Sequence, residues 1–166
     1  MKLIIDSGST KTDWIAIDGS NNILLETHTL GLNPQVLTEA IIEERIINNY
    51  DLYRVRNEVD SIYFYGAGCG TEPPRKLMGD VLKSIFQNAS ISVKEDTFAA
   101  VYAITDPGDP CIVCILGTGS NCSFFDGENV HQEITSLGYI LMDDASGNYF
   151  GRQLLRDYYF NKIPNP

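Results

Sequence analysis

Basic residues are scarce in this sequence: 12 Lys and Arg stand against 22 Asp and Glu, which gives a formal net charge of −10. Because proteins bind nucleic acids by neutralising phosphates with Lys and Arg, this balance argues against a nucleic-acid partner. Long apolar runs are missing too, since only three apolar residues separate Lys2 from Asp6 and the later runs have the length of strands. The sequence therefore predicts no signal peptide, no membrane span and no membrane partner. We expect the protein to be cytoplasmic.

Histidine and cysteine are also rare, with two of the former and four of the latter. Cys111 and Cys114 form a Cys-x-x-Cys pair, a spacing found in zinc and redox sites. However, the pair stands in an apolar run typical of a buried strand, where residues three apart point to opposite faces. His28 and His131 are isolated from it in the sequence. We therefore expect buried thiols here rather than metal ligands.

What remains is the composition of a globular protein, with 43% hydrophobic and 20% charged residues. A length of 166 residues suits one ordinary domain, or one small domain and part of another. The clearest linker is Asp106–Pro110, because two prolines and a glycine in five residues interrupt helices and strands alike. We place a boundary there, between a first lobe at 1–109 and a second lobe at 110–166.

Hydrophobic periodicity predicts an α/β fold. The predicted strands include Lys2–Ile5, Trp14–Ile17, Ile23–Thr27, Ser61–Tyr65, Ile91–Val93 and a strand around Ser123–Phe125. The predicted helices run from Pro34 to about Asn48, with Asn33 as N-cap, and over Arg75–Gln87, Thr97–Ile104 and Gly151–Asn161. An aromatic group is expected to form the core face of the last helix: Tyr149, Phe150, Tyr158, Tyr159 and Phe160.

The second lobe begins as the first one does. In the first lobe a strand, a Gly/Ser/Thr loop, a second strand, Asp18-Gly19 and a third strand follow one another. In the second lobe the same order recurs with Gly117-Thr118-Gly119-Ser120 as the loop and Asp126-Gly127 as the turn. Such self-similarity indicates a duplicated structural unit.

The two Gly/Ser/Thr loops are the strongest site candidates, because their backbone N–H groups and hydroxyls are suited to phosphate oxygens. The residues predicted to bind phosphate are Ser7, Gly8, Ser9, Thr10, Lys11, Gly117, Thr118, Gly119 and Ser120. Asp6, at the end of the first strand, could hold a magnesium ion. The first loop is not a Walker A loop, since an earlier glycine is missing and a strand follows. An ordinary hairpin turn, with Lys11 solvated, is the alternative.

Five motifs in order resemble the N-acetylglucosamine kinases within the BadF/BadG/BcrA/BcrD ATPase family. They are Asp6-Ser-Gly-Ser-Thr-Lys-Thr-Asp13, Gly66-Ala-Gly-Cys69, Asp96 with its Ala-rich helix, Gly117-Thr-Gly-Ser-Asn-Cys122 and Met142-Asp-Asp-Ala-Ser-Gly147. The resemblance covers nearly the whole chain. It implies an actin-like ATPase (ribonuclease H-like) fold, with a mixed five-stranded sheet and helices in the first lobe and the start of a similar second lobe.

The resemblance also implies a reaction, in which the γ-phosphoryl group of ATP passes to a hydroxyl of N-acetylglucosamine or a related amino sugar with Mg²⁺ as cofactor. The two loops would flank the triphosphate, Asp6 would be associated with the metal, and Asp96 would be the catalytic base. A plain helix N-cap is the alternative for Asp96. The residues expected to contact the sugar are Asn33, Thr118, Asn121, Asp143 and Asp144.

The sequence departs from the family's pattern in two segments that bear on the sugar. Met142, Asp144 and Ala145 stand where the family more often has Gly, Glu and Gly, and Leu137 stands where Gly or Trp is usual nearby. In the resembling kinases a further long segment carries the adenosine-binding motif and completes the second lobe. We therefore expect residues 1–166 alone to bind ATP weakly, to be inactive as a kinase, and to self-associate as a homodimer through an uncovered face.

Three other interpretations remain. Gly66-Ala67-Gly68-Cys69-Gly70 could begin a dinucleotide-binding unit, although Thr71 replaces the third glycine of that motif. An ATPase activator of a CoA-linked dehydratase belongs to the same superfamily and would carry an iron–sulfur cluster between subunits. A non-catalytic, sugar-sensing actin-like protein is the third interpretation.

Overall fold

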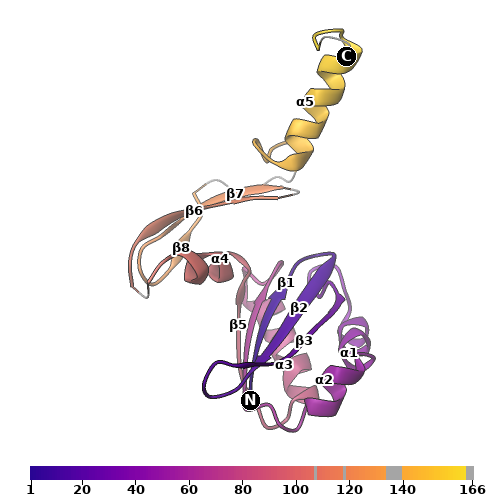
Figure 1. The fold of residues 1–166 in the computed structure, drawn as a ribbon, viewed down its shortest axis with the longest axis vertical. Coiled ribbons are helices and arrows are strands. Elements are labelled where there is room, and N and C mark those ends of the chain that lie inside the picture. Colours follow the sequence, from indigo (N-terminus) through magenta and orange to yellow (C-terminus); the bar gives the residue numbers. More distant parts are fainter. Residues whose placement is uncertain (107, 118, 134–139, 164–166) are drawn as a thin grey trace. The chain divides into compact units, whose positions relative to one another are not determined.

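The computed structural model describes residues 1–106, 108–117, 119–133 and 140–163. It consists of two compact units, Met1–Ala99 and Ala100–Pro166, with helix α4 (Thr97–Ile104) running across their division (Figure 1). The boundary at 109/110 stays a prediction. In the part of the chain that is described, no helix is long and apolar enough to cross a membrane.

The first unit is built on a five-stranded mixed sheet, which confirms the predicted sheet. Its strands are β1 (Lys2–Ser7), β2 (Lys11–Ile17), β3 (Ile23–Leu30), β4 (Ser61–Gly66) and β5 (Ser90–Glu95), in the order β3-β2-β1-β4-β5. The first three strands form an antiparallel meander, whereas β4 and β5 run parallel to β1. A sheet that begins with two hairpins lacks the βαβ start of a dinucleotide-binding unit.

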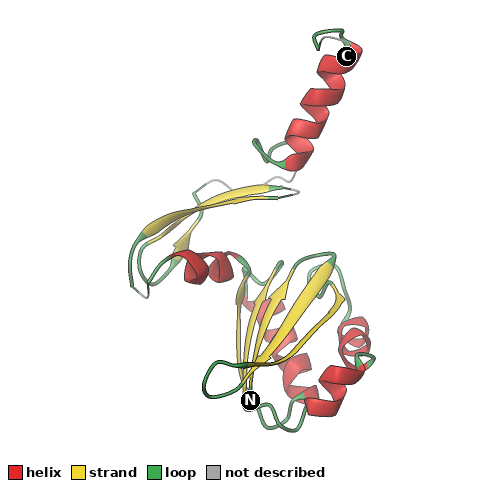
Figure 2. Ribbon diagram, viewed as in Figure 1, coloured by secondary structure: helices red, strands yellow, loops and turns green. Residues whose placement is uncertain are grey.

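Side chains alternate across this sheet, as the period of two along a strand requires. In β1, Leu3 and Ile5 are fully buried, while Ile4 and Asp6 are exposed on the other face. Helices α1 (Glu39–Ile47), α2 (Tyr50–Val55) and α3 (Glu72–Ile85) belong to the same unit (Figure 2). Their apolar residues form one core with the strands, which includes Trp14, Ile42, Leu52, Phe64, Met78 and Leu82.

The helices differ from the prediction in the segment after β3. The predicted start at Pro34 with Asn33 as N-cap is wrong, because α1 begins only at Glu39 with Thr38 before it. Asn33 instead forms a turn, in which its backbone carbonyl accepts from the N–H groups of Val36 and Leu37. The predicted end at Asn48 is confirmed, but the short α2 that follows was not predicted.

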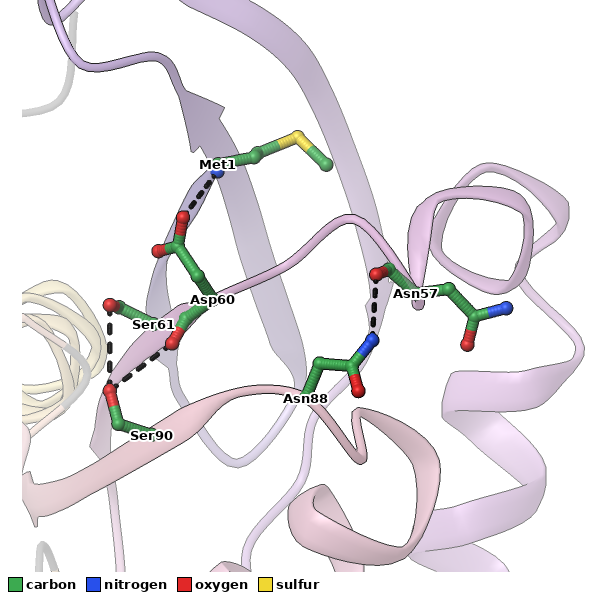
Figure 3. Close-up of polar contacts among 6 residues, drawn as sticks. All are labelled: Met1, Asn57, Asp60, Ser61, Asn88 and Ser90. Atoms are coloured by element: carbon green, nitrogen blue, oxygen red, sulfur yellow. Dashed lines mark hydrogen bonds and ion pairs between the residues drawn. The ribbon is translucent and has the colours of Figure 1, made fainter.

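A polar network joins the amino-terminal ends of the parallel strands (Figure 3). The amino group of Met1 donates to Asp60 Oδ2 at 2.8 Å, and Ser90 Oγ donates to the backbone carbonyl of Asp60 at 3.2 Å. The hydrogen bond from the terminal ammonium group lowers the pKa of Asp60. These contacts tie the segments before β1, β4 and β5 to one another.

The second unit contains the predicted repeat. Strands β6 (Cys111–Leu116), β7 (Ser120–Phe125) and β8 (Val130–His131) form an antiparallel meander, as β1–β3 do. In both Asp-Gly turns the aspartate Oδ1 accepts from two backbone N–H groups. For Asp18 they belong to the residues two and four positions later, and for Asp126 to those two and three positions later. A similar turn between the second and third strands supports the duplication.

One face of this meander is apolar and exposed. Val113 and Phe125 point to the buried face, whereas Ile112, Leu116 and Phe124 point outward. Cys114 and Cys122 lie on the exposed face as well, so the expectation that the cysteines are buried is wrong for these two. It holds for Cys69, which is buried in the first unit.

The last helix, α5 (Gly147–Tyr159), has none of its described residues buried. The predicted core face is therefore wrong in this chain: Phe150, Tyr158, Tyr159 and Phe160 are all exposed, with Tyr159 at 77% of its surface. The helix itself is amphipathic. Its amino-terminal end is capped by Ser146, whose Oγ accepts from the N–H of Tyr149 at 3.1 Å. Its apolar side chains lack cover within the described chain.

Candidate functional site

The carboxyl ends of the three parallel strands bring together acidic residues from distant parts of the sequence. Asp6 in β1 lies beside Tyr65 in β4, and Gly66 lies beside Glu95 in β5. Asp96 follows β5 directly, so Asp6 and Asp96 stand at the same edge with one strand between them. Ligands of open α/β sheets bind at this edge. The structure thus places the predicted base and the predicted metal-associated acid within one region.

The first loop closes the β1–β2 hairpin next to Asp6. Its backbone turns tightly, since the N–H of Gly8 donates to the carbonyl of Lys11 at 2.9 Å. Ser7 and Thr12 flank the turn with hydroxyls 2.8 Å apart, and the buried Ser7 hydroxyl also accepts from the N–H of Leu32 at 3.2 Å. The hydroxyl of Ser7 is therefore occupied with shaping the loop, while residues 8–11 are exposed to solvent.

Residues just after β3 hold this loop from outside the hairpin. The N–H of Gly31 donates to the carbonyl of Thr10 at 2.8 Å, and a Cβ at Gly31 would collide with the backbone carbonyl of Ser9. Asn33 Nδ2 donates to Ser9 Oγ at 3.3 Å. The sequence did not single out Gly31, although a glycine directly after a strand is the available signal for such a close approach.

The glycine turn after β4 packs against the same asparagine. Gly68 has a φ of 83°, and a Cβ there would collide with Asn33 Oδ1. The Asn33 oxygen also accepts from the N–H of Gln35 at 2.9 Å. The turn of residues 66–68, Asn33 and the first loop therefore form a continuous rim at the carboxyl edge.

Three carboxyl groups of this edge have raised pKa values. Burial is the main cause for the half-buried Asp96; the backbone N–H of Thr97 opposes the shift, and the charge of Asp6 adds to it. The pKa of Glu95 is raised mainly by burial and secondly by the charge of Asp96, and the charge of Arg75 partly offsets this rise. Asp6 is exposed, but partial desolvation followed by the charge of Asp13 raises its pKa as well. The edge is thus an acidic site that favours cations and protons.

Cys69 borders the acidic group without being a nucleophile. Burial is the main cause that raises its pKa to about 12, and the charge of Asp96 adds to this. Because only a thiolate attacks electrophiles, the neutral Cys69 thiol is a packing residue at ordinary pH.

The second loop, in the other unit, is joined to the segment before α5. Ser120 Oγ donates to the carbonyl of Asp144 at 2.7 Å, and the N–H of Gly147 donates to the carbonyl of Gly117 at 2.8 Å. A Cβ at Gly119 would meet the carboxylate of Asp143, so this side chain packs directly against the second loop. Thr118, predicted to contact both phosphate and sugar, lies outside the described residues.

A pocket of about 580 Å³ in the second unit brings together three residues predicted to contact the sugar: Asn121, Asp143 and Asp144. Apolar side chains of Leu116 and Phe124 line it too. Several polar groups on an apolar lining are typical of a small-molecule site. The pocket therefore agrees with the predicted grouping of these three residues.

The segment that departs from the family's pattern is backbone-strained. Asp143 and Ala145 have φ values of 65° and 63°, in the left-handed region that favours glycine. At the position of Ala145 the resembling kinases more often have glycine. The positive φ at this position explains that preference, because glycine adopts it without strain. Each non-glycine residue in this conformation costs about 1–2 kcal/mol, and such strain is concentrated at functional sites.

Comparison with solved structures decides the family. A candidate N-acetylglucosamine kinase from Porphyromonas gingivalis is 34% identical with a TM-score of 0.88, over 99% of this chain and 58% of that chain. The chain belongs to the N-acetylglucosamine kinase-like proteins. These proteins have the predicted actin-like ATPase fold. The chain spans 58% of the length of the P. gingivalis relative.

More distant structures share the fold of this kinase-like chain. A candidate N-acetylglucosamine kinase from Chromobacterium violaceum is 17% identical with a TM-score of 0.64, over 99% of this chain and 60% of its own. A ROK-family glucokinase from Streptomyces griseus, solved with glucose and AMPPNP, is 18% identical with a TM-score of 0.52, over 78% and 46%. No family model matched the chain.

Proposed function

We propose that the protein is an ATP-dependent kinase whose acceptor is a hydroxyl of N-acetylglucosamine or a related amino sugar. The observation that carries this proposal is the carboxyl edge of the first sheet, where the half-buried Asp96 shares a region with Asp6 and with the Gly8–Lys11 loop. A carboxylate, a second acid and a solvent-exposed Gly/Ser/Thr turn are parts suited to phosphoryl transfer.

Asp96 is proposed to accept the proton of the attacking sugar hydroxyl. Its raised pKa supports this role, because a general base works best when its pKa approaches the operating pH. The hydrogen bond from the N–H of Thr97 holds the carboxylate at the start of α4, so the role of base and that of helix cap are compatible. The same contact that fixes the helix end would therefore orient the catalytic oxygen.

The phosphate groups are proposed to lie against residues 8–11, which the buried Ser7 holds in place, and against Gly117, Thr118, Gly119 and Ser120. The exposure of Gly8 to Lys11 supports this for the first loop. Mg²⁺ is usually held by one or two carboxylates together with substrate phosphates, and the exposed Asp6 fits that donor set. When bound, the ion would neutralise charge on the transferred phosphoryl group.

The sugar is proposed to contact Asn33, Thr118, Asn121, Asp143 and Asp144. Short polar side chains recognise a sugar because a wrong one leaves their buried groups unpaired. The pocket beside Asn121, Asp143 and Asp144 supports this assignment. Asp144 is one methylene shorter than the usual glutamate, so the choice between N-acetylglucosamine and a related amino sugar is expected to depend on this position.

A panel of hexoses and amino sugars in a coupled ADP-release assay tests the function. With purified protein at the length its gene encodes, we expect N-acetylated amino sugars to stimulate ADP release more than glucose or galactose do. The matched control is the same assay without sugar. Equal ADP release with and without every sugar would refute the kinase proposal.

We also propose that residues 1–166 self-associate in the cytoplasm as a homodimer through the exposed apolar side chains of α5. The support is the exposure of apolar side chains such as Leu154, Leu155 and Tyr159, because large apolar patches favour association. Sedimentation velocity should give a dimer at micromolar concentration, and Leu154→Glu with Leu155→Glu should give a monomer. A monomeric wild-type chain throughout the micromolar range would overturn this prediction.

A further inference from the structure

Two exposed cysteines of the second unit face each other across neighbouring strands. Cys114 in β6 and Cys122 in β7 are direct partners in the antiparallel register, and their Sγ atoms are 3.5 Å apart. Both side chains are exposed. The kinase proposal assigns neither of them a role.

The backbone geometry suits a covalent link between them. Directly opposed residues of an antiparallel pair have Cα atoms about 4.5 or 5.5 Å apart, and both values lie within the range of about 4.4–6.8 Å that disulfides span. The sulfur atoms must approach from 3.5 Å to about 2.05 Å. Small rotations of the two side chains supply this movement, so the strands keep their register.

The other cysteines lack this geometry. Cys111 is opposite Phe125 and is half-buried, and in a strand its side chain points to the face away from Cys114. Cys69 belongs to the other unit and is buried. The Cys-x-x-Cys spacing in the sequence therefore draws attention to the wrong pair.

We propose that Cys114 and Cys122 are a thiol-oxidation site, which forms a reversible disulfide across β6 and β7 by exchange with a small-molecule disulfide such as oxidised glutathione. One cysteine loses its proton and attacks a sulfur of oxidised glutathione, releasing one glutathione thiol and leaving a mixed disulfide. The second cysteine, deprotonated in turn, attacks the protein sulfur of that mixed disulfide and releases the second glutathione thiol. Two protein thiols are thus oxidised and one glutathione disulfide is reduced.

The link would close a ring of residues 114–122, which contains the second loop. Gly117, Gly119, Ser120 and Asn121 lie inside this ring, and Cys114, Cys122 and Asn121 line the same pocket. The hydrogen bond between the two thiols is the main cause that raises the pKa of Cys122. Since the thiolate is the attacking species, oxidation should accelerate as the pH rises above neutrality.

The test exposes the purified chain to oxidised glutathione, unfolds it in guanidinium chloride, blocks the remaining thiols, including the buried Cys69, with N-ethylmaleimide and measures the intact mass. We expect a product that has lost two hydrogen atoms and carries two maleimide groups. Unfolded chain that is reduced with dithiothreitol before the alkylation should carry four. Chymotrypsin cleaves after Leu116 and Phe124, so the linked peptides can be separated; the interval from Glu95 to Gly151 has no lysine or arginine for trypsin.

Matched variants identify the pair. Cys111→Ser should still form the link, whereas Cys122→Ser should retain at most one glutathione adduct on Cys114. A link that persists in Cys122→Ser, a link lost in Cys111→Ser, glutathione adducts alone in the wild-type chain, or bonds between chains would each overturn the proposal. Cys111 and Cys114 share the chymotryptic peptide that ends at Leu116, so fragmentation of the linked peptide between these two residues, by tandem mass spectrometry, identifies the pair in the wild-type chain even if a variant does not fold.

Discussion

Asp96→Asn is expected to lower the rate of sugar phosphorylation by about 10²–10⁴-fold, the usual contribution of a general base. The amide cannot accept the hydroxyl proton, but its oxygen can still accept from the N–H of Thr97. Helix α4 should therefore keep its start. The loss should appear in kcat, with the KM values for ATP and sugar nearly unchanged, because binding groups remain in place.

The same variant should be more stable than the wild type at neutral pH. The folded-state pKa of Asp96 is raised above the ordinary 3.8, so the folded chain holds this proton more tightly than the unfolded chain. The ionised carboxyl then costs stability: the cost is absent below pH 3.8, grows as the pH rises through the folded-state pKa, and is complete above it. Urea unfolding should show a gain for Asp96→Asn at pH 7 that disappears as the pH falls below 4.

Asp80→Asn is the matched control, because Asp80 is an exposed carboxylate on α3 that forms a surface ion pair with Lys76 at 2.7 Å. A surface pair of this kind contributes little, so activity should not change. If Asp96→Asn keeps wild-type kcat, Asp96 is not the base. If it loses activity and also stability at pH 7, the loss reflects damage to the fold.

Gly31→Ala is expected to destabilise the protein by about 1–3 kcal/mol, the usual cost of overpacking, and to raise the KM for ATP. A Cβ at this position would meet the backbone carbonyls of Ser9 and Gly8, which cannot rotate away as a side chain would. The β1–β2 loop must therefore shift, together with the N–H groups proposed to bind phosphate. Urea unfolding and ATP titration of the initial rate measure the two effects.

Gly19→Ala provides the comparison for this prediction. Gly19 lies in the other turn of the same meander, and a Cβ there would have nothing within 4 Å. Its unfolding free energy should stay within about 0.5 kcal/mol of the wild type, with ATP kinetics unchanged. Equal unfolding free energies for the two variants would show that the loop has room at Gly31.

Local patterns predicted the strands well because each strand carries its own alternation. The apolar residues of β1 and β4 recur with a period of two, and the Asp-Gly turns stand where hairpins need them. Asn33 shows the limit of such patterns. Its side chain is a good N-cap by type, yet it makes a turn and a bond to Ser9, which lies 24 residues earlier in the chain.

Contacts between distant segments account for the other differences. A glycine directly after a strand signals a close approach, but nothing local names Ser9 as the neighbour of Gly31, and the pairing of Cys114 with Cys122 follows from the register of two strands. The exposure of α5 could not be predicted from local sequence either, because an amphipathic helix has the same residue pattern whether its apolar face is covered or not. Site residues that belong to motifs could be predicted from the sequence. Asp6 and Asp96 are examples, and both lie at the carboxyl ends of the parallel strands.

The location of the hydrophobic core bears on how the chain is made. Every residue of the main core cluster lies between Leu3 and Ala89, so this part can collapse during translation before the second unit has left the ribosome. Domains generally fold in this amino-terminal-first order during synthesis. The nascent first unit would then have its core in place when β6 emerges, and the apolar strands of the second unit would be the last part of this chain to need protection from aggregation.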